Sequence, residues 1–193
     1  MSRYRSHHNL SPLASDHERL RRDVQHRLSS LSHMGLALCL ERVLKRLGYS
    51  NIRILGHWYL PGRSFITNAD LSSRGIRPLQ PVQLVVRIAR YTVPVPRHSV
   101  NDLYRTMLRS NAPEALLVTT SEFSESGAQA TLSFPGRSVK LLEGMQFADL
   151  LIQYGFGVRE CRDILTGEIS TVLDELAFEN LERIADALRT ADN

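Results

Sequence analysis

The chain has 193 residues, enough for one ordinary domain with a sizeable core, and 42% of them are apolar and 23% charged. No apolar run approaches the ~18 residues of a membrane span, and the first 15 residues lack the apolar segment of a secretory signal. Cys39 and Cys161 are far apart, and neither belongs to a Cys-x-x-Cys pair. We therefore expect a cytoplasmic protein with free thiols, no membrane contact and no cysteine-based metal site.

The net charge of +4 conceals an uneven distribution of charge along the chain. Residues 49–100 hold seven arginines and a single acid, Asp70, whereas residues 159–193 hold four basic and nine acidic residues. Such blocks are typical either of a solvated surface or of a face that binds a partner of opposite charge. The sequence therefore predicts a basic face suited to a polyanion, followed by an acidic C-terminal segment.

Two helices are predicted at the start of the chain. Ser15 and Glu18 have the spacing of a capping box, and apolar residues then recur at helical intervals as far as Leu31. The second predicted helix lies within residues 32–50, is heavily apolar, and has Gly48 placed to end it. We expect an amphipathic first helix with arginines on its outer face and a central second helix.

Strands and helices are predicted to alternate after this point. Strands are expected over 51–60, 64–71, 82–91, 114–121 and 137–142, and helices over 99–110, 124–134 and 143–155. Ser99 and Ser124 are the predicted caps of the first two of these helices. The first three strands are close in sequence and can pair antiparallel, whereas the later ones are separated by helices and can be parallel.

The tail is predicted to form one amphipathic helix over 166–190, because apolar residues recur from Ile169 to Leu188 at helical spacing. Its apolar stripe would suit a homodimer interface, a protein partner, or packing against the basic first helix. Three parts are therefore expected, namely a basic helical arm over 1–32, a core over 33–158 and an acidic helix over 159–193.

Four segments carry a resemblance to a known family: LERVLKRLGYSNIRILG from Leu40, ARY from Ala89, ALLVTTSEFSESGAQAT from Ala115 and VKLLEGMQFADLLIQYGFGV from Val139. In order and spacing they resemble the Mrr-like restriction endonuclease domain, a branch of the PD-(D/E)xK nuclease superfamily. The resemblance implies a restriction-endonuclease-like α/β fold, with a mixed central sheet flanked by helices and with helical extensions at both ends.

The resemblance also implies where a nuclease site would lie. The family holds Mg²⁺ with an aspartate and with a Glu or Gln on the next strand, and a lysine two residues further activates water. Asp70 matches the aspartate and Glu41 a helix glutamate, but Arg87 stands at the Glu/Gln position and Ala89 at the lysine position. A guanidinium repels a metal ion and cannot coordinate it. We therefore expect cleavage to be lost, with Asp70 the one remaining metal ligand if any metal binds.

Two cations could replace the missing lysine. Lys45 lies one turn after Glu41, either as a relocated catalytic lysine or as an ordinary ion-pair partner. Arg90 follows the lysine position, but a guanidinium does not deprotonate and would be a poor proton relay. Neither replacement removes the positive charge of Arg87 from the metal position.

The basic block predicts contacts to DNA phosphates, with affinity that falls with salt. The predicted nucleic-acid-binding residues are Arg63, Arg74, Arg77, Arg87, Arg90, Arg97 and Ser121. Three functions remain open, namely DNA binding without cleavage or cofactor, an active Mg²⁺ endonuclease with a rearranged site, and a protein-interaction scaffold. The resemblance suggests a bacterial protein, and the sequence does not choose among phage defence, a mobile element and repair.

Overall fold

A computed structural model describes residues 12–55, 65–71, 82–134 and 136–191. Two helices, α1 (Pro12–Ser30) and α2 (His33–Arg46), precede the strands β1 (Tyr49–Leu55), β2 (Phe65–Leu71) and β3 (Val82–Ala89). There follow α3 (Arg97–Arg109), β4 (Glu114–Thr119), α4 (Glu125–Ala130), the 3₁₀ helix η1 (Thr131–Ser133), β5 (Ser138–Leu142) and α5 (Gly144–Gln153). The chain ends with the strands β6 (Val158–Arg162) and β7 (Ile169–Leu173) and the helix α6 (Glu175–Ala191).

The central sheet has five strands in the order β1-β2-β3-β4-β5. Strands β1, β2 and β3 pair antiparallel, whereas β3, β4 and β5 pair parallel. The predicted mixed sheet is therefore confirmed, including the change of direction at β3. The helices that follow β3 and β4 make the crossovers that parallel pairing requires. No helix among the described residues is long and apolar enough to cross a membrane.

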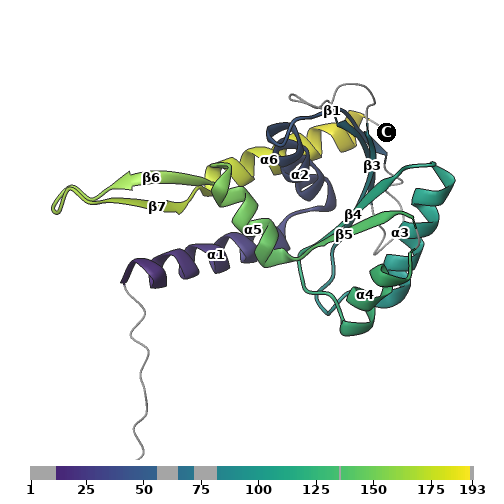
Figure 1. Cartoon of the computed structure of the whole chain (residues 1–193). Helices are drawn as coiled ribbons and strands as arrows, with labels where there is room; N and C mark the ends of the chain where they lie inside the picture. The colour runs from purple at the N-terminus through teal and green to yellow at the C-terminus, as the bar shows by residue number, and fades with distance from the viewer. Residues whose placement is uncertain (1–11, 56–64, 72–81, 135, 192–193) are drawn as a thin grey trace, which may run out of the picture.

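Helices cover both faces of the sheet, as Figure 1 shows. Alternate residues of β3 face the two sides, because side chains along a strand point in opposite directions. Leu84, Val86 and Ile88 belong to the core shared with α1, α2, α5 and α6, whereas Val85 and Ala89 belong to a second core under α3 and α4. Residues 87 and 89 of β3 therefore lie on the α3 face.

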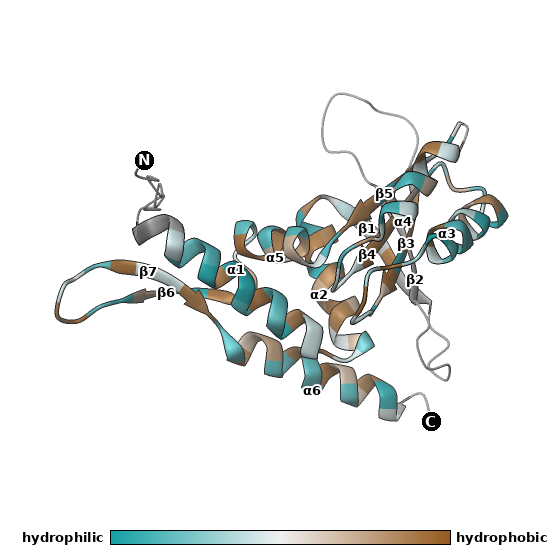
Figure 2. Cartoon of the chain, turned by 90° about the horizontal axis from the view of Figure 1, so that it is seen from below, coloured by the Kyte–Doolittle hydropathy of each residue, from teal (hydrophilic) through white to brown (hydrophobic). Residues whose placement is uncertain are grey.

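The first helix is part of the larger core. Val24, Leu28 and Leu31 are fully buried, and Arg21 donates hydrogen bonds of 2.5 and 2.8 Å to Asp149 of α5. Figure 2 shows hydrophilic residues along much of α1, in contrast to the predominantly hydrophobic strands of the sheet. The predicted amphipathic helix is therefore confirmed, and its apolar stripe packs on the domain.

Two predicted caps are wrong. Helix α1 already begins at Pro12, a residue well suited to a first turn, so Ser15 and Glu18 lie inside the helix. Helix α3 begins at Arg97 after Pro96, and the Ser99 hydroxyl instead lies 2.9 Å from the Tyr91 hydroxyl. The predicted ends at Gly48 and at Gly155 are confirmed by φ values of 93° and 64°.

The prediction of one long C-terminal helix is also wrong. Residues 158–173 form a hairpin of β6 and β7, and only Glu175–Ala191 is helical. Asp163 closes the turn, because its Oδ1 accepts hydrogen bonds from the backbone N–H groups of Leu165 and Thr166, and Gly167 adopts a φ of 74°. The β-branched run that starts at Ile169 then favours a strand over a helix.

The acidic helix α6 packs back on the basic N-terminal part of the domain. Phe178, Leu181 and Ala185 are buried in the larger core, and Glu175 pairs with Arg27 of α1 at 2.8 Å. Packing against the first helix was one of the three expectations for the tail, but α6 packs mainly on α2 and meets α1 through Arg27. The homodimer and the protein partner stay predictions.

Candidate nuclease-like site and nucleic-acid interface

Arg87, at the predicted metal-ligand position, lies half-buried between β3 and α3. Its Nη2 donates a 3.2 Å hydrogen bond to Oγ1 of Thr106, and its Nε is buried with no hydrogen-bond partner among the described residues. Burial lowers the pKa of Arg87, the carboxylate of Asp102 acts in the opposite direction, and the guanidinium of Arg109 lowers the pKa further. The site therefore holds a cation that is desolvated and incompletely bonded.

Ala89, at the predicted lysine position, is 6% exposed and packs in the core under α3. Its methyl group cannot donate a proton or bind an anion. At these two positions β3 thus offers a guanidinium and a methyl group, where the resemblance predicts an oxygen ligand and an amine. This donor set does not fit a Mg²⁺ ion, which requires oxygen ligands.

Glu41 lies on α2, which packs on the opposite face of the sheet from Arg87 and Ala89. Its carboxylate is 2.7 Å from Nζ of Lys45, whose side chain is 61% exposed. The structure therefore does not bring Glu41 together with the two β3 positions. The Glu41–Lys45 contact has the geometry of an ordinary pair one helical turn apart.

Asp70 lies in β2, where its Cα pairs with Gln83 of β3. Arg87 pairs with Ile66 of β2. This pair is four residues away from the Asp70–Gln83 pair on each strand, or about 13 Å along the strands. Asp70 and Arg87 are therefore not cross-strand neighbours. The side chain of Asp70 lies outside the described part of the structure.

The ends of β3 and β4 bring three other predicted residues to one edge of the sheet. Arg90 and Arg97 are exposed, Arg90 directly after β3 and Arg97 in the first turn of α3. The Ser121 hydroxyl, just beyond β4, donates a 3.0 Å hydrogen bond to the carbonyl of Val93. Parallel strands place their carboxyl ends at the same edge, so these residues share one end of the sheet.

A short bridge holds the connections at this edge together. Val95 and Phe123 form an isolated parallel β-bridge, and the N–H of Val95 donates a 2.8 Å hydrogen bond to the carbonyl of Glu122. Burial and the charge of Arg90 both lower the pKa of His33, so Arg90 lies near the start of α2. The exposed side chains of Glu122 and Glu125 are also near this edge, which therefore carries both signs of charge.

Three predicted DNA-binding residues, Arg63, Arg74 and Arg77, lie outside the described residues. Among the residues that are described, no group of three or more His, Cys, Asp or Glu side chains has the geometry to hold a metal ion. The described part of the candidate interface thus rests on Arg87, Arg90, Arg97 and Ser121.

Sequence reasoning missed the partner of Arg87. Thr106 lies 19 residues away on α3, and it meets Arg87 because α3 runs back across β3 after the crossover. The Thr106 hydroxyl also donates a 3.0 Å bond to the backbone carbonyl of Asp102. A threonine in a helix gives no local signal of such a contact, since helical threonines commonly bond to the preceding turn.

The mixed sheet between α2 and α3 defines a restriction-endonuclease-like domain, and the predicted fold class is confirmed. The chain belongs to the Mrr_cat restriction endonuclease family, whose model matches residues 28–151. The predicted family resemblance is thereby confirmed.

Two solved structures are similar to this chain. The DNA modification-dependent restriction endonuclease AspBHI is 20% identical with a TM-score of 0.54, over 79% of this chain and 39% of that one. The restriction endonuclease MspJI, in complex with a 27-mer oligonucleotide, is 18% identical with a TM-score of 0.47, over 78% of this chain and 34% of that one. The chain thus spans less than two-fifths of the length of either protein. A comparison with curated proteins finds no match.

Proposed function

We propose that this restriction-endonuclease-like domain binds DNA through the edge formed by the ends of β3 and β4, and that it does not cleave the DNA. The observation that carries the proposal is the partly desolvated guanidinium of Arg87, at the position predicted for the family's metal ligand. A fixed positive charge there favours a phosphate and opposes a divalent cation. Ala89 removes the amine that would activate water.

The partner is inferred from fold and charge together. AspBHI is by its name an endonuclease that depends on DNA modification, and its fold is shared with this chain. Arg90 and Arg97 are exposed at the proposed edge, and neither forms an ion pair with a described residue. Exposed guanidinium groups bind phosphates while the carboxylates beside them limit non-specific attraction, so we expect binding of moderate strength that weakens with salt.

A mobility-shift titration of the full chain tests the binding. A 30-base-pair duplex, a single strand and a four-way junction are compared at ~50 and ~200 mM salt, because each phosphate contact adds about −0.9 to the salt slope of a duplex. We expect Arg90→Ala combined with Arg97→Ala to reduce affinity at least tenfold at the lower salt. Arg189→Ala, an exposed arginine in the last turn of α6, is the matched control. Failure to bind any of the three probes at the lower salt contradicts the proposal.

Incubation of plasmid DNA with the protein and Mg²⁺ or Mn²⁺ tests the absence of cleavage. We expect supercoiled plasmid to remain intact over hours at protein concentrations that saturate binding. Cleavage that Asp70→Ala abolishes would show an active, rearranged nuclease and would refute this half of the proposal. The same variant also exposes a contaminating nuclease, because cleavage from that source persists unchanged in Asp70→Ala.

A further inference from the structure

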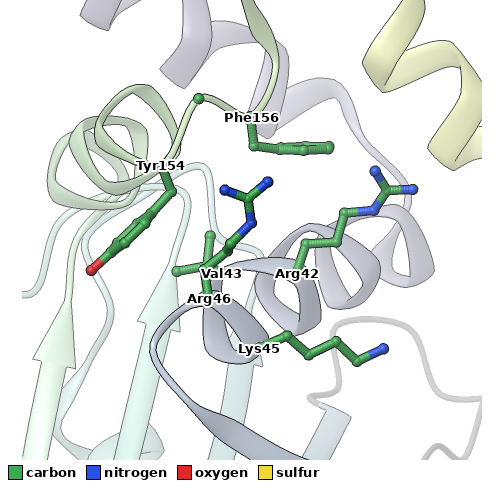
Figure 3. A pocket seen from close by; sticks show the side chains of 7 residues that line it. Arg42, Val43, Lys45, Arg46, Tyr154 and Phe156 are labelled. Carbon is green, nitrogen blue, oxygen red and sulfur yellow. The ribbon is translucent and has the colours of Figure 1, made fainter.

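A pocket of about 330 Å³ lies between the C-terminal half of α2 and the turn that follows α5. Its volume is at the lower end of the range for small-molecule sites. Figure 3 shows its lining residues, Arg42, Val43, Lys45, Arg46, Tyr154, Gly155 and Phe156. The pocket therefore combines three cations from one helix with two aromatic rings from one turn.

The turn after α5 holds the aromatic wall in place. Gly155 and Gly157 have φ values of 64° and 72°, which reverse the chain on either side of Phe156. A Cβ on Gly157 would lie 2.3 Å from the ring of Phe178, so glycine is required there. The rings of Phe156 and Phe178 meet edge to face at 5.9 Å. The wall is thus anchored to the buried part of α6.

The cations of the pocket are not equivalent. Lys45 pairs with Glu41 at 2.7 Å and points away from the aromatic rings in Figure 3. Arg42 lies over the Phe156 ring with its guanidinium 5.1 Å from the centroid. The guanidinium of Arg46 points into the space between Tyr154 and Phe156 in Figure 3.

Neither Arg42 nor Arg46 forms an ion pair with a described residue. Both are exposed and lie in the last turns of α2, where the helix dipole contributes the equivalent of roughly half a negative charge. The dipole therefore offsets only a part of the two guanidinium charges. The pocket keeps a net positive charge beside an aromatic surface.

We propose that this pocket binds a nucleoside phosphate, with the guanidinium groups of Arg42 and Arg46 on the phosphate and the ring of Tyr154 against the base. Planar guanidinium groups match phosphate oxygens with paired hydrogen bonds. An aromatic ring accepts any base by stacking. The same chemistry is offered by a free nucleotide and by the terminal nucleotide of a DNA strand, and a titration with both distinguishes the two sources.

The pocket is separate from the proposed DNA-binding edge. Arg46 is at the end of α2 opposite to His33, about 20 Å away along the helix axis, and it is His33 that lies near Arg90. Arg87 is on the other face of the sheet. The nucleoside phosphate site therefore does not depend on the proposed function, and either proposal can fail alone.

Isothermal titration calorimetry of the full chain tests the site with four probes, namely thymidine 5′-monophosphate, thymidine, a 5′-phosphorylated four-nucleotide strand and the same strand without its phosphate. We expect the monophosphate to bind with a dissociation constant below about 1 mM and thymidine to bind at least tenfold more weakly. Stronger binding of the phosphorylated strand than of both its unphosphorylated form and the monophosphate identifies a strand end as the source, and tighter binding of the monophosphate identifies a free nucleotide. Equal binding of thymidine and its monophosphate overturns the proposal.

The decisive variant is Arg46→Ala, because the Arg46 guanidinium points into the space between the two rings, whereas that of Arg42 lies over the Phe156 ring. We expect at least tenfold weaker binding of the monophosphate, partial recovery in Arg46→Lys, and an unchanged melting temperature. Arg105→Ala is the matched control, since Arg105 is an exposed helical arginine on the other face of the sheet, with its side chain 71% exposed. Undiminished binding in Arg46→Ala, or an equal loss in Arg105→Ala, overturns the proposal.

Discussion

Replacing Arg87 by methionine should separate the stability of this domain from its function. Methionine keeps a straight apolar side chain of similar length while it removes the charge and all five N–H donors. In the structure that charge is half-buried, its Nε has no partner among the described residues, and its hydrogen bond to Thr106 is 3.2 Å long. The variant therefore removes an unfavourable group from the interior.

The magnitude follows from two opposing contributions. A buried donor without a partner costs about 1–3 kcal/mol, whereas a hydrogen bond from a charged group contributes about 1.5–3 kcal/mol. Methionine also avoids the cost of removing a charge from water on folding, which favours the variant further. We expect Arg87→Met to change the free energy of unfolding by about 0 to 2 kcal/mol in the stabilising direction. Urea unfolding followed by circular dichroism measures this change. An unchanged slope m in the variant verifies that both proteins unfold in a comparable two-state transition.

DNA affinity should move in the opposite direction. A unit charge about 10 Å from a phosphate contributes about 0.4 kcal/mol to binding at the dielectric constant of water and about 1.7 kcal/mol at that of a protein surface. The larger value corresponds to at most roughly a twentyfold change in affinity. We therefore expect weaker binding of duplex DNA together with unchanged or raised stability, as is usual where a functional group is kept at a cost in stability.

The refuting result for Arg87→Met is a loss of more than about 1 kcal/mol of stability with DNA affinity unchanged. That outcome would make the guanidinium a structural group that bonds α3 to β3. Thr106→Val is the matched control, because it deletes the acceptor of the Arg87 bond, together with the bond from the Thr106 hydroxyl to the Asp102 carbonyl, and keeps the guanidinium. It should leave the charge in place, reduce stability by about 1 kcal/mol, and leave DNA affinity unaltered.

Three further outcomes are expected. Gly144→Ala should lower the free energy of unfolding by about 1–3 kcal/mol, because its Cβ would lie 2.3 Å from the backbone oxygen of Thr120. Leu28→Ala should lower it by about 2–5 kcal/mol, since this α1 side chain is fully buried. DNA bound at Arg90 should raise the pKa of His33 in NMR titrations, because the phosphate offsets the charge that helps to hold this pKa low in the free protein.

Each of these three outcomes has a result that contradicts it. An unchanged urea midpoint in Gly144→Ala would contradict the first, because it would mean that the backbone shifts to accommodate the added methyl group without a measurable loss of stability. Ser29→Ala, an exposed neighbour on α1, is the control for Leu28→Ala, and equal effects of the two would exclude α1 from the cooperative core. A His33 pKa that stays the same in saturating DNA would place the phosphates away from Arg90.

The pKa of His33 also has a consequence for stability in the absence of DNA. Because burial lowers this pKa in the folded state, the unfolded chain takes up a proton first as the pH falls. The neutral imidazole therefore contributes stability above its unfolded pKa of about 6.5, and this contribution is lost as the pH falls toward the folded pKa. A urea midpoint that drops between pH 7 and 5, and drops less in His33→Gln, would agree with this sign.

Local pattern was sufficient for most of the elements. The apolar run of β3, the parallel strand β4 and the glycine stops at Gly48 and Gly155 depend on neighbours within a few residues, and all were predicted. The tail was not, because its apolar residues fit both a helical and a strand period, and the choice depended on the Asp163 turn. Side-chain hydrogen bonds that close such a turn have no periodic signature.

The sequence by itself determined the family and the mixed sheet, because these follow from residue identity and from order along the chain. It also predicted the chemical departure at Arg87 and Ala89. Only the tertiary structure decided that Glu41 lies on the other face of the sheet from these two positions, and that Arg87 meets Thr106. The physical reason is that a sheet has two faces and a crossover helix can return over either, so residues close in a motif can be separated by a layer of backbone. Contacts between faces are set by packing, which no single segment encodes.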